Sequence, residues 1–214
     1  MLELNKIYLM DCMEGMRQFP DKYFELAIVD PPYGNTDAIG IKNGKSHCAN
    51  RKDYHLFDNK KPEDTYFKEL VRVSKNQIVW GGNFFGLIGG YICWNKNGTC
   101  FGECELAYCS MQNSVKLFEY TWNGMLQGNM KDKELRIHPT QKPVALYGWL
   151  LNNYAKQGDK ILDTHLGSAS SVLACLKLNF EYIGFEIDED YFKAAQERID
   201  NFKSQVSFFD EGFI

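Results

Sequence analysis

The chain has 214 residues, of which 44% are hydrophobic, 24% charged and 14% aromatic, and its formal net charge is −4. This composition excludes a disordered or fibrous protein, and the length fits one domain that can fold without disulfides or metal. The negative charge excludes a protein that binds nucleic acid through bulk positive charge, so a nucleic-acid partner would need a local basic patch.

Five short apolar runs each end in an acidic residue or a glycine. They cover residues 6–10, 26–29, 77–80, 160–162 and 182–185. Because they are apolar on both faces, they are typical of strands in a covered parallel sheet. Between them lie helical patterns over 62–73, 143–155, 168–178 and 189–202. Strands that alternate with helices predict an α/β, doubly wound sheet.

Three later runs follow one another without a convincing helix between them. They cover 91–94, 106–110 and 116–121, and we expect them to be antiparallel strands at one edge of the sheet. Two stretches, 34–61 and 123–137, are long for loops in a compact domain, which marks them as candidates for function.

The cysteines and apolar runs indicate where the protein resides. The cysteine count of seven is odd, the first ten residues lack a signal-peptide core, and no apolar run could span a bilayer. We therefore expect a cytoplasmic protein with reduced thiols and no membrane contact. Cys100, Cys104 and Cys109 lack the second close pair of a zinc site, so we expect buried structural cysteines and no metal.

The first candidate site is Asp30, Pro31, Pro32 and Tyr33, directly after the run 26–29. Ligands of open α/β sheets bind at the carboxyl ends of strands. Asp30 and the carbonyl of Pro31 offer two acceptors without a competing N–H, and the Pro-Pro pair stiffens the turn. Tyr33 supplies a ring on which a base can stack. These residue types suit the exocyclic amine of a flipped nucleobase, although an ordinary proline-rich turn can have the same sequence.

A second candidate site lies at 160–170, where a strand ends in an acid and a small-residue turn opens a helix. Glu186, at the end of the next predicted strand, follows Gly167 by 19 residues, the spacing at which an acid binds a ribose diol across a βαβ unit. Only one glycine of the three-glycine dinucleotide fingerprint is present. A ligand without a pyrophosphate does not need that close approach, which favours S-adenosylmethionine over NAD. Many βαβ units, however, carry one acid and one glycine for packing alone.

A third candidate is the stretch 138–143, His-Pro-Thr-Gln-Lys-Pro, before a predicted helix. Proline in the first turn is an ordinary way to start a helix. Alternatively, the helix N-terminus and Lys142 would bind the carboxylate of a cofactor's methionine moiety.

In combination, these motifs resemble the DNA amino-methyltransferases of the permuted β class, in which the catalytic motif precedes the cofactor motif. The opening 7–30 is similar to the family's first strand, Asp-Cys pair, short helix and Phe-Pro-Asp element, and 72–73, 92–96 and 138–143 are similar to later elements. The resemblance implies a single domain over 1–214 with a Rossmann-like S-adenosylmethionine-dependent methyltransferase fold and a permuted motif order.

The resemblance also implies a role for each matching residue. The catalytic residues, which would bind the target amine and base, are Asp30, Pro31, Pro32 and Tyr33. The cofactor-binding residues are Asp11 near the adenine, Glu186 at the ribose, Asp163, Gly167 and Ser168 on the methionine side, and Gln141, Lys142 and Pro143, which complete the pocket. Asp at the first position of the catalytic motif favours adenine N6, since the cytosine-N4 enzymes more often have Ser there.

Two departures from the family pattern change these expectations. The cofactor turn usually reads Asp-Pro-Phe-x-Gly-Ser-Gly-Thr, whereas this chain has Thr164, His165, Ala169 and Ser170. Loss of the aromatic residue would loosen the cofactor packing, and His165 would line the pocket without acting as a base. The family also inserts a substantial target-recognition region before 138–143, whereas here only 123–137 occupies that place.

The loop 34–61 carries six basic and three acidic residues. We expect it to be mobile and to contact DNA phosphates through Lys42, Lys45, Arg51 and Lys52. A solvated loop without a DNA contact is the alternative.

The sequence thus predicts methyl transfer from S-adenosylmethionine to adenine N6 in DNA. Two alternatives stay open: a cytosine-N4, RNA or protein-amide methyltransferase, and a non-catalytic DNA-binding subunit of the same fold. The short recognition region suggests relaxed specificity or a second subunit that supplies recognition. A homodimer is open too, because enzymes of the family that the chain resembles often dimerise. Restriction-modification, anti-restriction and regulation all fit the sequence.

Overall fold

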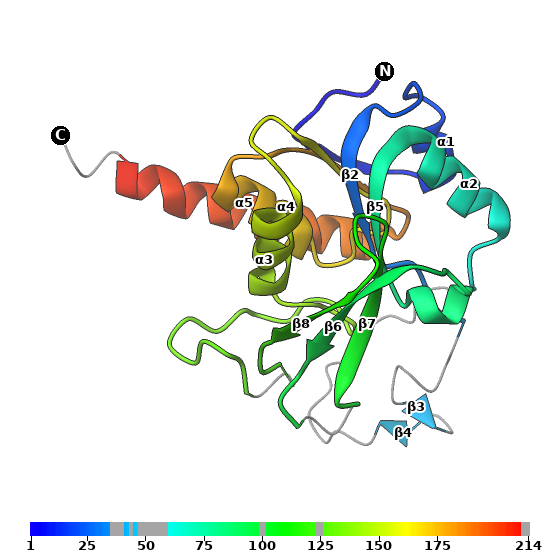
Figure 1. Cartoon of the computed structure of the whole chain (residues 1–214). Coiled ribbons are helices and arrows are strands. Elements are labelled where there is room, and N and C mark those ends of the chain that lie inside the picture. The colour runs from blue at the N-terminus through cyan, green and yellow to red at the C-terminus, as the bar shows by residue number, and fades with distance from the viewer. Residues whose placement is uncertain (35–40, 43–44, 47–59, 99–101, 123–125, 211–214) are drawn as a thin grey trace.

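The computed structural model describes residues 1–34, 41–42, 45–46, 60–98, 102–122 and 126–210, with only the backbone described at 41–42, 45–46 and 206–210 (Figure 1). The strands are β1 (Lys6–Leu9), β2 (Phe24–Val29), β3 (Ile41–Lys42), β4 (Lys45–Ser46), β5 (Ser74–Trp80), β6 (Gly90–Asn95), β7 (Cys104–Cys109), β8 (Val115–Glu119), β9 (Lys160–Asp163) and β10 (Glu181–Glu186). The helices are α1 (Cys12–Met16), α2 (Asp64–Val73), α3 (Val144–Tyr154), α4 (Ser170–Leu178) and α5 (Glu189–Asp210), with a 3₁₀ turn, η2, at Gly82–Phe85.

The main sheet is mostly parallel and has the strand order β1-β10-β9-β2-β5-β7-β6-β8, while β3 and β4 form a separate two-stranded sheet. The predicted α/β, doubly wound fold is confirmed. The direction of the later strands needs a correction. β7 runs antiparallel to both β5 and β6, but β8 pairs with β6 in parallel. β7, which lies between β5 and β6, therefore runs against its neighbours. β8, at the edge, runs in the same direction as β6, so the edge pair is parallel and not antiparallel as expected.

Helices cover both faces of the sheet because side chains alternate between the faces along each strand. On β2, Leu26 and Ile28 pack with α3, α4 and α5, while Ala27 and Val29 pack with α1 and α2. The central strands are therefore apolar on both sides, as the continuous apolar runs predicted. In Figure 1, α3, α4 and α5 accordingly lie on one side of the central strands, with α1 and α2 beyond β2 and β5.

Helix boundaries differ from the sequence pattern at two places. α4 begins at Ser170, two residues after the predicted start, because Ala169 has a left-handed φ of 58° that a helix cannot include. α5 continues to Asp210, beyond the predicted end at residue 202. Within the described ranges, no helix is long and apolar enough to cross a membrane.

The cysteines follow the prediction only in part. Cys109 and Cys175 are buried, but Cys104 is exposed, and Cys12 and Cys93 are partly buried. Cys104 is exposed because it is the first residue of β7, opposite Asn95 at the end of β6. Cys48 and Cys100 lie outside the described residues. Among the described side chains, no cluster of His, Cys, Asp and Glu could hold a metal ion.

Candidate active site

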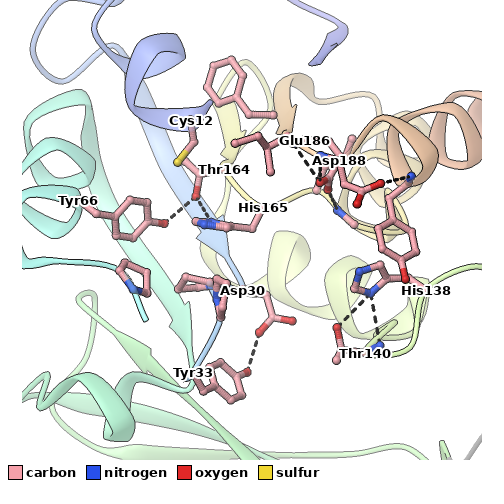
Figure 2. Close-up of a pocket in the computed structure, with 18 of the residues that line it drawn as sticks. Cys12, Asp30, Tyr33, Tyr66, His138, Thr140, Thr164, His165, Glu186 and Asp188 are labelled. Atoms are coloured by element: carbon pink, nitrogen blue, oxygen red, sulfur yellow. Dashed lines mark hydrogen bonds between the residues drawn. The ribbon is translucent and has the colours of Figure 1, made fainter. Parts of the chain in front are cut away.

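A cavity of about 690 Å³ opens where the parallel strands β1, β10, β9 and β2 end. Their carboxyl ends meet at one edge of the sheet, so motifs far apart in sequence share its walls (Figure 2). The predicted site residues on these walls are Asp11, Asp30, Pro31, Pro32, Tyr33, Gln141, Lys142, Gly167, Ser168 and Glu186. The volume is that of an ordinary small-molecule site.

The four residues after β2 bring a carboxylate and an aromatic ring into the cavity. The Tyr33 hydroxyl donates a hydrogen bond to Asp30 Oδ1 at 2.6 Å, and burial followed by the charge of Asp30 raises the pKa of Tyr33, so the hydroxyl remains a donor. The ring stacks on Phe84, with centroids 5.1 Å apart. Gly81 permits this position, because a Cβ there would lie 2.3 Å from the Tyr33 ring. One face of the ring predicted to stack on a base is therefore covered by protein.

Lys142 lines the cavity, and its ammonium group forms an ion pair with Asp30 Oδ2. The same nitrogen lies 3.2 Å from Glu105 Oε2, and Lys96 pairs with the other oxygen of Glu105. Burial opposes charge on Lys142, but the two carboxylates outweigh it and raise its pKa. Lys142 is therefore a charged partner of the catalytic motif.

Glu105 is the acid that joins the two lysines. Burial would raise the pKa of Glu105, but the charges and hydrogen bonds of Lys142 and Lys96 lower it to about 2. The four groups, two acids and two ammonium ions, form a neutral cluster from the ends of β2 and β6, from β7 and from the segment before α3. Glu105 was not among the residues predicted from the sequence. Its signal there is an acid directly before the apolar segment Leu106–Cys109, together with a lysine, Lys96, at the end of the preceding apolar run.

Glu186 and Gly167 meet as their 19-residue spacing predicted. The Gly167 N–H donates to Glu186 Oε2 at 2.7 Å, and the N–H groups of Ile187 and Asp188 donate to Oε1 at 3.0 Å each. These bonds fix the carboxylate in the cavity, and Oε2 keeps a second lone pair for a ligand hydroxyl. Gly167 has a left-handed φ of 50°, which a side chain would strain.

Two predicted cofactor residues do not line the cavity. Asp163 is buried behind the turn, where its carboxylate accepts hydrogen bonds from the Ser171 hydroxyl at 2.5 Å and the His165 N–H at 3.1 Å. Burial raises the pKa of Asp163 to about 7. Pro143 lies at the N-cap of α3. Both residues shape the chain next to the cavity, so a direct cofactor contact is not assigned to either.

The N-terminus of α3 also differs from the prediction. The Val144 N–H donates to Glu134 Oε1 at 2.8 Å, and Arg198 donates to Glu134 Oε2 at 2.6 Å. A carboxylate of the chain itself therefore occupies the position expected for a cofactor carboxylate. Gln141 reaches the cavity wall, yet its side-chain oxygen accepts from the Ile137 N–H at 2.9 Å, which holds the preceding segment.

His138 and Thr140, from the same stretch, line the cavity although neither was predicted as a site residue. The Thr140 N–H lies 3.3 Å from His138 Nδ1, and the His138 ring packs edge-on against Tyr191 with centroids 4.3 Å apart. Burial, followed by the charges of Lys142 and Arg136, lowers the pKa of His138 to about 3. His138 is therefore a neutral wall residue at neutral pH.

Asp11 and His165 lie at the other side of the cavity. Asp11 caps α1, since its Oδ1 accepts from the N–H groups of Met13 and Glu14 at 2.8 and 3.2 Å. His165 Nδ1 lies 2.9 Å from Thr164 Oγ1, which in turn lies 2.6 Å from the Tyr66 hydroxyl. Burial lowers the pKa of His165 to about 4. This hydrogen-bonded chain (Figure 2) fixes the imidazole where the family pattern has Phe.

The loop residues expected to contact DNA are only partly described. Lys42 and Lys45 belong to β3 and β4, but their side chains, and Arg51 and Lys52 entirely, lie outside the described residues. In the segment 123–137, Gln127 is buried. Its side-chain oxygen accepts from the Glu134 N–H at 2.8 Å, and its side-chain nitrogen donates to the Glu134 carbonyl at 2.9 Å. This part of 123–137 thus holds Glu134 in place.

Comparison with known proteins agrees with the fold and the motifs. A family model for DNA methylase, of the N6 and N4 class, matches residues 94–197. YubD of Escherichia coli (strain K12) is 25% identical over 88% of this chain and 87% of that protein.

Two solved structures share the fold. M1.HpyAVI in complex with S-adenosylmethionine superposes with a TM-score of 0.59 and 18% identity over 90% of this chain and 98% of that one. The cytosine-N4-specific PvuII DNA methyltransferase does so with a TM-score of 0.60 and 12% identity over 94% and 92%. These findings confirm the resemblance predicted from the sequence: residues 94–197 match the DNA methylase model, and the fold is similar to that of these two structures.

Proposed function

We propose that this protein transfers a methyl group from S-adenosylmethionine to the exocyclic N6 amine of a flipped adenine in DNA. The observation that carries the proposal is one cavity with two kinds of group on its wall. Asp30, Pro31 and Tyr33 offer acceptors and a ring at one end, and the Glu186–Gly167 pair offers a fixed carboxylate at the other.

The cofactor end fits S-adenosylmethionine by its chemistry. Glu186 Oε2 has a lone pair left for a ribose hydroxyl, and the left-handed Gly167 keeps side-chain bulk out of the turn. Asp11 adds a second carboxylate, and His138 and His165 are neutral polar walls. When bound, S-adenosylmethionine supplies a methyl group whose C–S bond breaks with its electron pair left on sulfur.

The residues of the chain prepare the amine for this transfer. Asp30 and the Pro31 carbonyl accept its two hydrogens, so the nitrogen lone pair is withdrawn from ring conjugation and forms the new N–C bond. The nitrogen becomes cationic at that moment, and the Asp30 carboxylate stabilises the charge. The surplus proton then leaves along the Asp30 hydrogen bond to water in the open cavity.

The choice of adenine rests on the acid at position 30, since a carboxylate at the first position of this motif favours N6. The fold likeness to a cytosine-N4-specific enzyme makes cytosine N4 the second candidate.

The test is incubation of the purified protein with methyl-labelled S-adenosylmethionine and mixed-sequence DNA, followed by mass spectrometry of the nucleosides. We expect labelled N6-methyladenine. Labelled N4-methylcytosine alone would replace adenine with cytosine. Transfer only to RNA or protein would refute DNA as the substrate. If no acceptor is labelled and calorimetry detects no cofactor binding, the chain is a non-catalytic subunit.

A further inference from the structure

The Lys96–Glu105–Lys142–Asp30 cluster contains one cation within reach of two acids. The Lys142 ammonium group forms its ion pair with Asp30 and lies 3.2 Å from Glu105 Oε2, and its side chain is only 4% exposed. Lys96, which is also buried, holds the other oxygen of Glu105. A buried charge must remain paired, and Asp30 and Glu105 are two acids near Lys142 that can pair with it.

The contact between Lys142 and Asp30 is incompatible with the final stage of the proposed reaction, on which this inference rests. Asp30 already accepts hydrogen bonds from Lys142 on Oδ2 and from Tyr33 on Oδ1. An incoming amine must share this carboxylate with both donors. As the methyl group arrives, the amine nitrogen becomes cationic, and a fixed ammonium ion on the same carboxylate would repel it.

We propose that Lys142 is a positioning residue that holds Asp30 before the base arrives and moves onto Glu105 when the target amine binds. The second ion pair is formed in advance, so the shift leaves no buried charge unpaired. Trp80 and Tyr33 border the path, since the Lys142 nitrogen lies 5.2 and 5.9 Å from their ring centroids, and both aromatic faces favour a cation. Glu105 is thus the second acceptor without which Lys142 stays on Asp30.

The test changes Glu105 and compares two DNA duplexes. Glu105→Gln removes the second acceptor, Glu105→Asp keeps its charge, and Glu103→Gln, at an exposed position two residues away, is the matched control. One duplex carries adenine at the site methylated by the wild-type protein. The other carries purine there, which lacks the amine. Turnover, duplex affinity and calorimetric binding of S-adenosylmethionine are measured for each variant.

We expect Glu105→Gln to lower kcat at least tenfold and to leave cofactor affinity within threefold of the wild-type value. Its affinity for the adenine duplex should fall at least fivefold more than its affinity for the purine duplex. Glu105→Asp should restore most of the loss, and Glu103→Gln should match the wild type. If Glu105→Gln fails to bind cofactor, the two duplexes are compared with Glu105→Asp instead. We then expect a smaller loss of affinity that is again larger for the adenine duplex than for the purine duplex.

Equal weakening of both duplexes would mean that Glu105 only supports the fold, and a kcat within twofold of the wild-type value would mean that Lys142 need not move. Either result overturns the inference while the proposed function stands. Absence of transfer by the wild-type protein on every DNA overturns the proposed function and this inference with it.

Discussion

Asp30 is oriented by donors that approach its two oxygens separately, the Tyr33 hydroxyl on Oδ1 and Lys142 on Oδ2. A free carboxylate at a strand end could rotate, whereas this one is fixed before any ligand binds. Preorganised groups of this kind stabilise charge at little reorganisation cost. Lys142 keeps Glu105 as a partner if the Asp30 carboxylate is removed. The acid can therefore be deleted without leaving a buried ammonium ion unpaired.

Asp30→Ala should accordingly separate catalysis from cofactor binding. We expect methyl transfer to fall by at least about 10²–10³-fold, since the acceptor for the amine is lost. The calorimetric affinity for S-adenosylmethionine should stay within threefold, because Glu186 and Gly167 are untouched. Glu197→Ala, at an exposed acid of α5, is the control and should change neither quantity. Lost cofactor binding with retained turnover would contradict the assigned roles.

Asp163 gives the stability of the protein a dependence on pH. Its pKa is about 7 in the folded protein and near 3.8 when unfolded, so between these values the folded state binds the extra proton. The stabilisation is complete below pH 3.8 and is lost as the pH rises through 7. Between pH 5 and pH 8 the free energy of unfolding of the wild-type protein should fall by about 3 kcal/mol because Asp163 loses its proton.

Asp163→Asn isolates this effect, because the amide can bond Ser171 and the His165 N–H but cannot titrate. The measurement is the free energy of unfolding in urea for both proteins at pH 5 and pH 8. We expect the free energy of unfolding of Asp163→Asn, taken relative to that of the wild-type protein, to be about 2–3 kcal/mol higher at pH 8 than at pH 5. A difference that is the same at both pH values would show that Asp163 is ionised throughout this range.

At the scale of elements, Glu134 and Arg198 join the beginnings of two helices to the middle of a third. Glu134 accepts from the first N–H of α3, and Arg198, within α5, donates to the Ser168 carbonyl and the Ser170 hydroxyl where α4 begins. Their side chains are only 19% and 13% exposed. Glu134, which lies in the predicted recognition segment 123–137, therefore connects three helices beside the cavity through its pair with Arg198.

Arg198→Met should destabilise the protein by about 3–5 kcal/mol, because it leaves the Glu134 carboxylate partly buried without its cation. Urea denaturation at neutral pH measures the change. Lys193→Met removes a cation from the same helix, where the pair with Glu189 is exposed, and should leave the free energy of unfolding close to the wild-type value. Similar losses of stability for both variants would show that Arg198 does not stabilise the three helices through its pair with Glu134.

At the scale of the whole molecule, charge is distributed unevenly around the cavity. The net charge is −4, yet the loop 34–61 has a surplus of basic residues. Both ends of that loop are anchored beside the catalytic motif. Gly34 lies against Lys61, since a Cβ added at Gly34 would be 3.1 Å from the Cβ of Lys61, and Lys60 and Lys61 line the cavity. Any DNA that presents a base to the cavity therefore passes close to the attachment points of this loop.

Replacing Lys42, Lys45, Arg51 and Lys52 with Ala should weaken DNA binding and reduce its dependence on salt. Each lost phosphate contact lowers the slope of log affinity against log salt by about 0.9. Fluorescence anisotropy across a range of salt concentrations measures both quantities. The control replaces the exposed Lys156, Lys177, Lys193 and Lys203, which changes the net charge equally. Equal slopes for the two variants would show that the loop acts only through bulk charge.

The sequence by itself determined the order of strands and helices, the fold and the two ends of the cavity. Apolar runs with strong punctuation locate elements because burial and turn chemistry are local, and the 19-residue spacing between Gly167 and Glu186 spans one βαβ unit of fixed geometry.

Only the tertiary structure decided which groups meet across long separations. Lys142 lies 112 residues from Asp30, and no local pattern states that it bonds this carboxylate rather than a ligand. The parallel direction of β8, the burial of Asp163 behind the turn and the use of Glu134 at the start of α3 have the same origin. A buried charge or unpaired N–H takes the partner that packing brings near, and packing is a property of the whole chain.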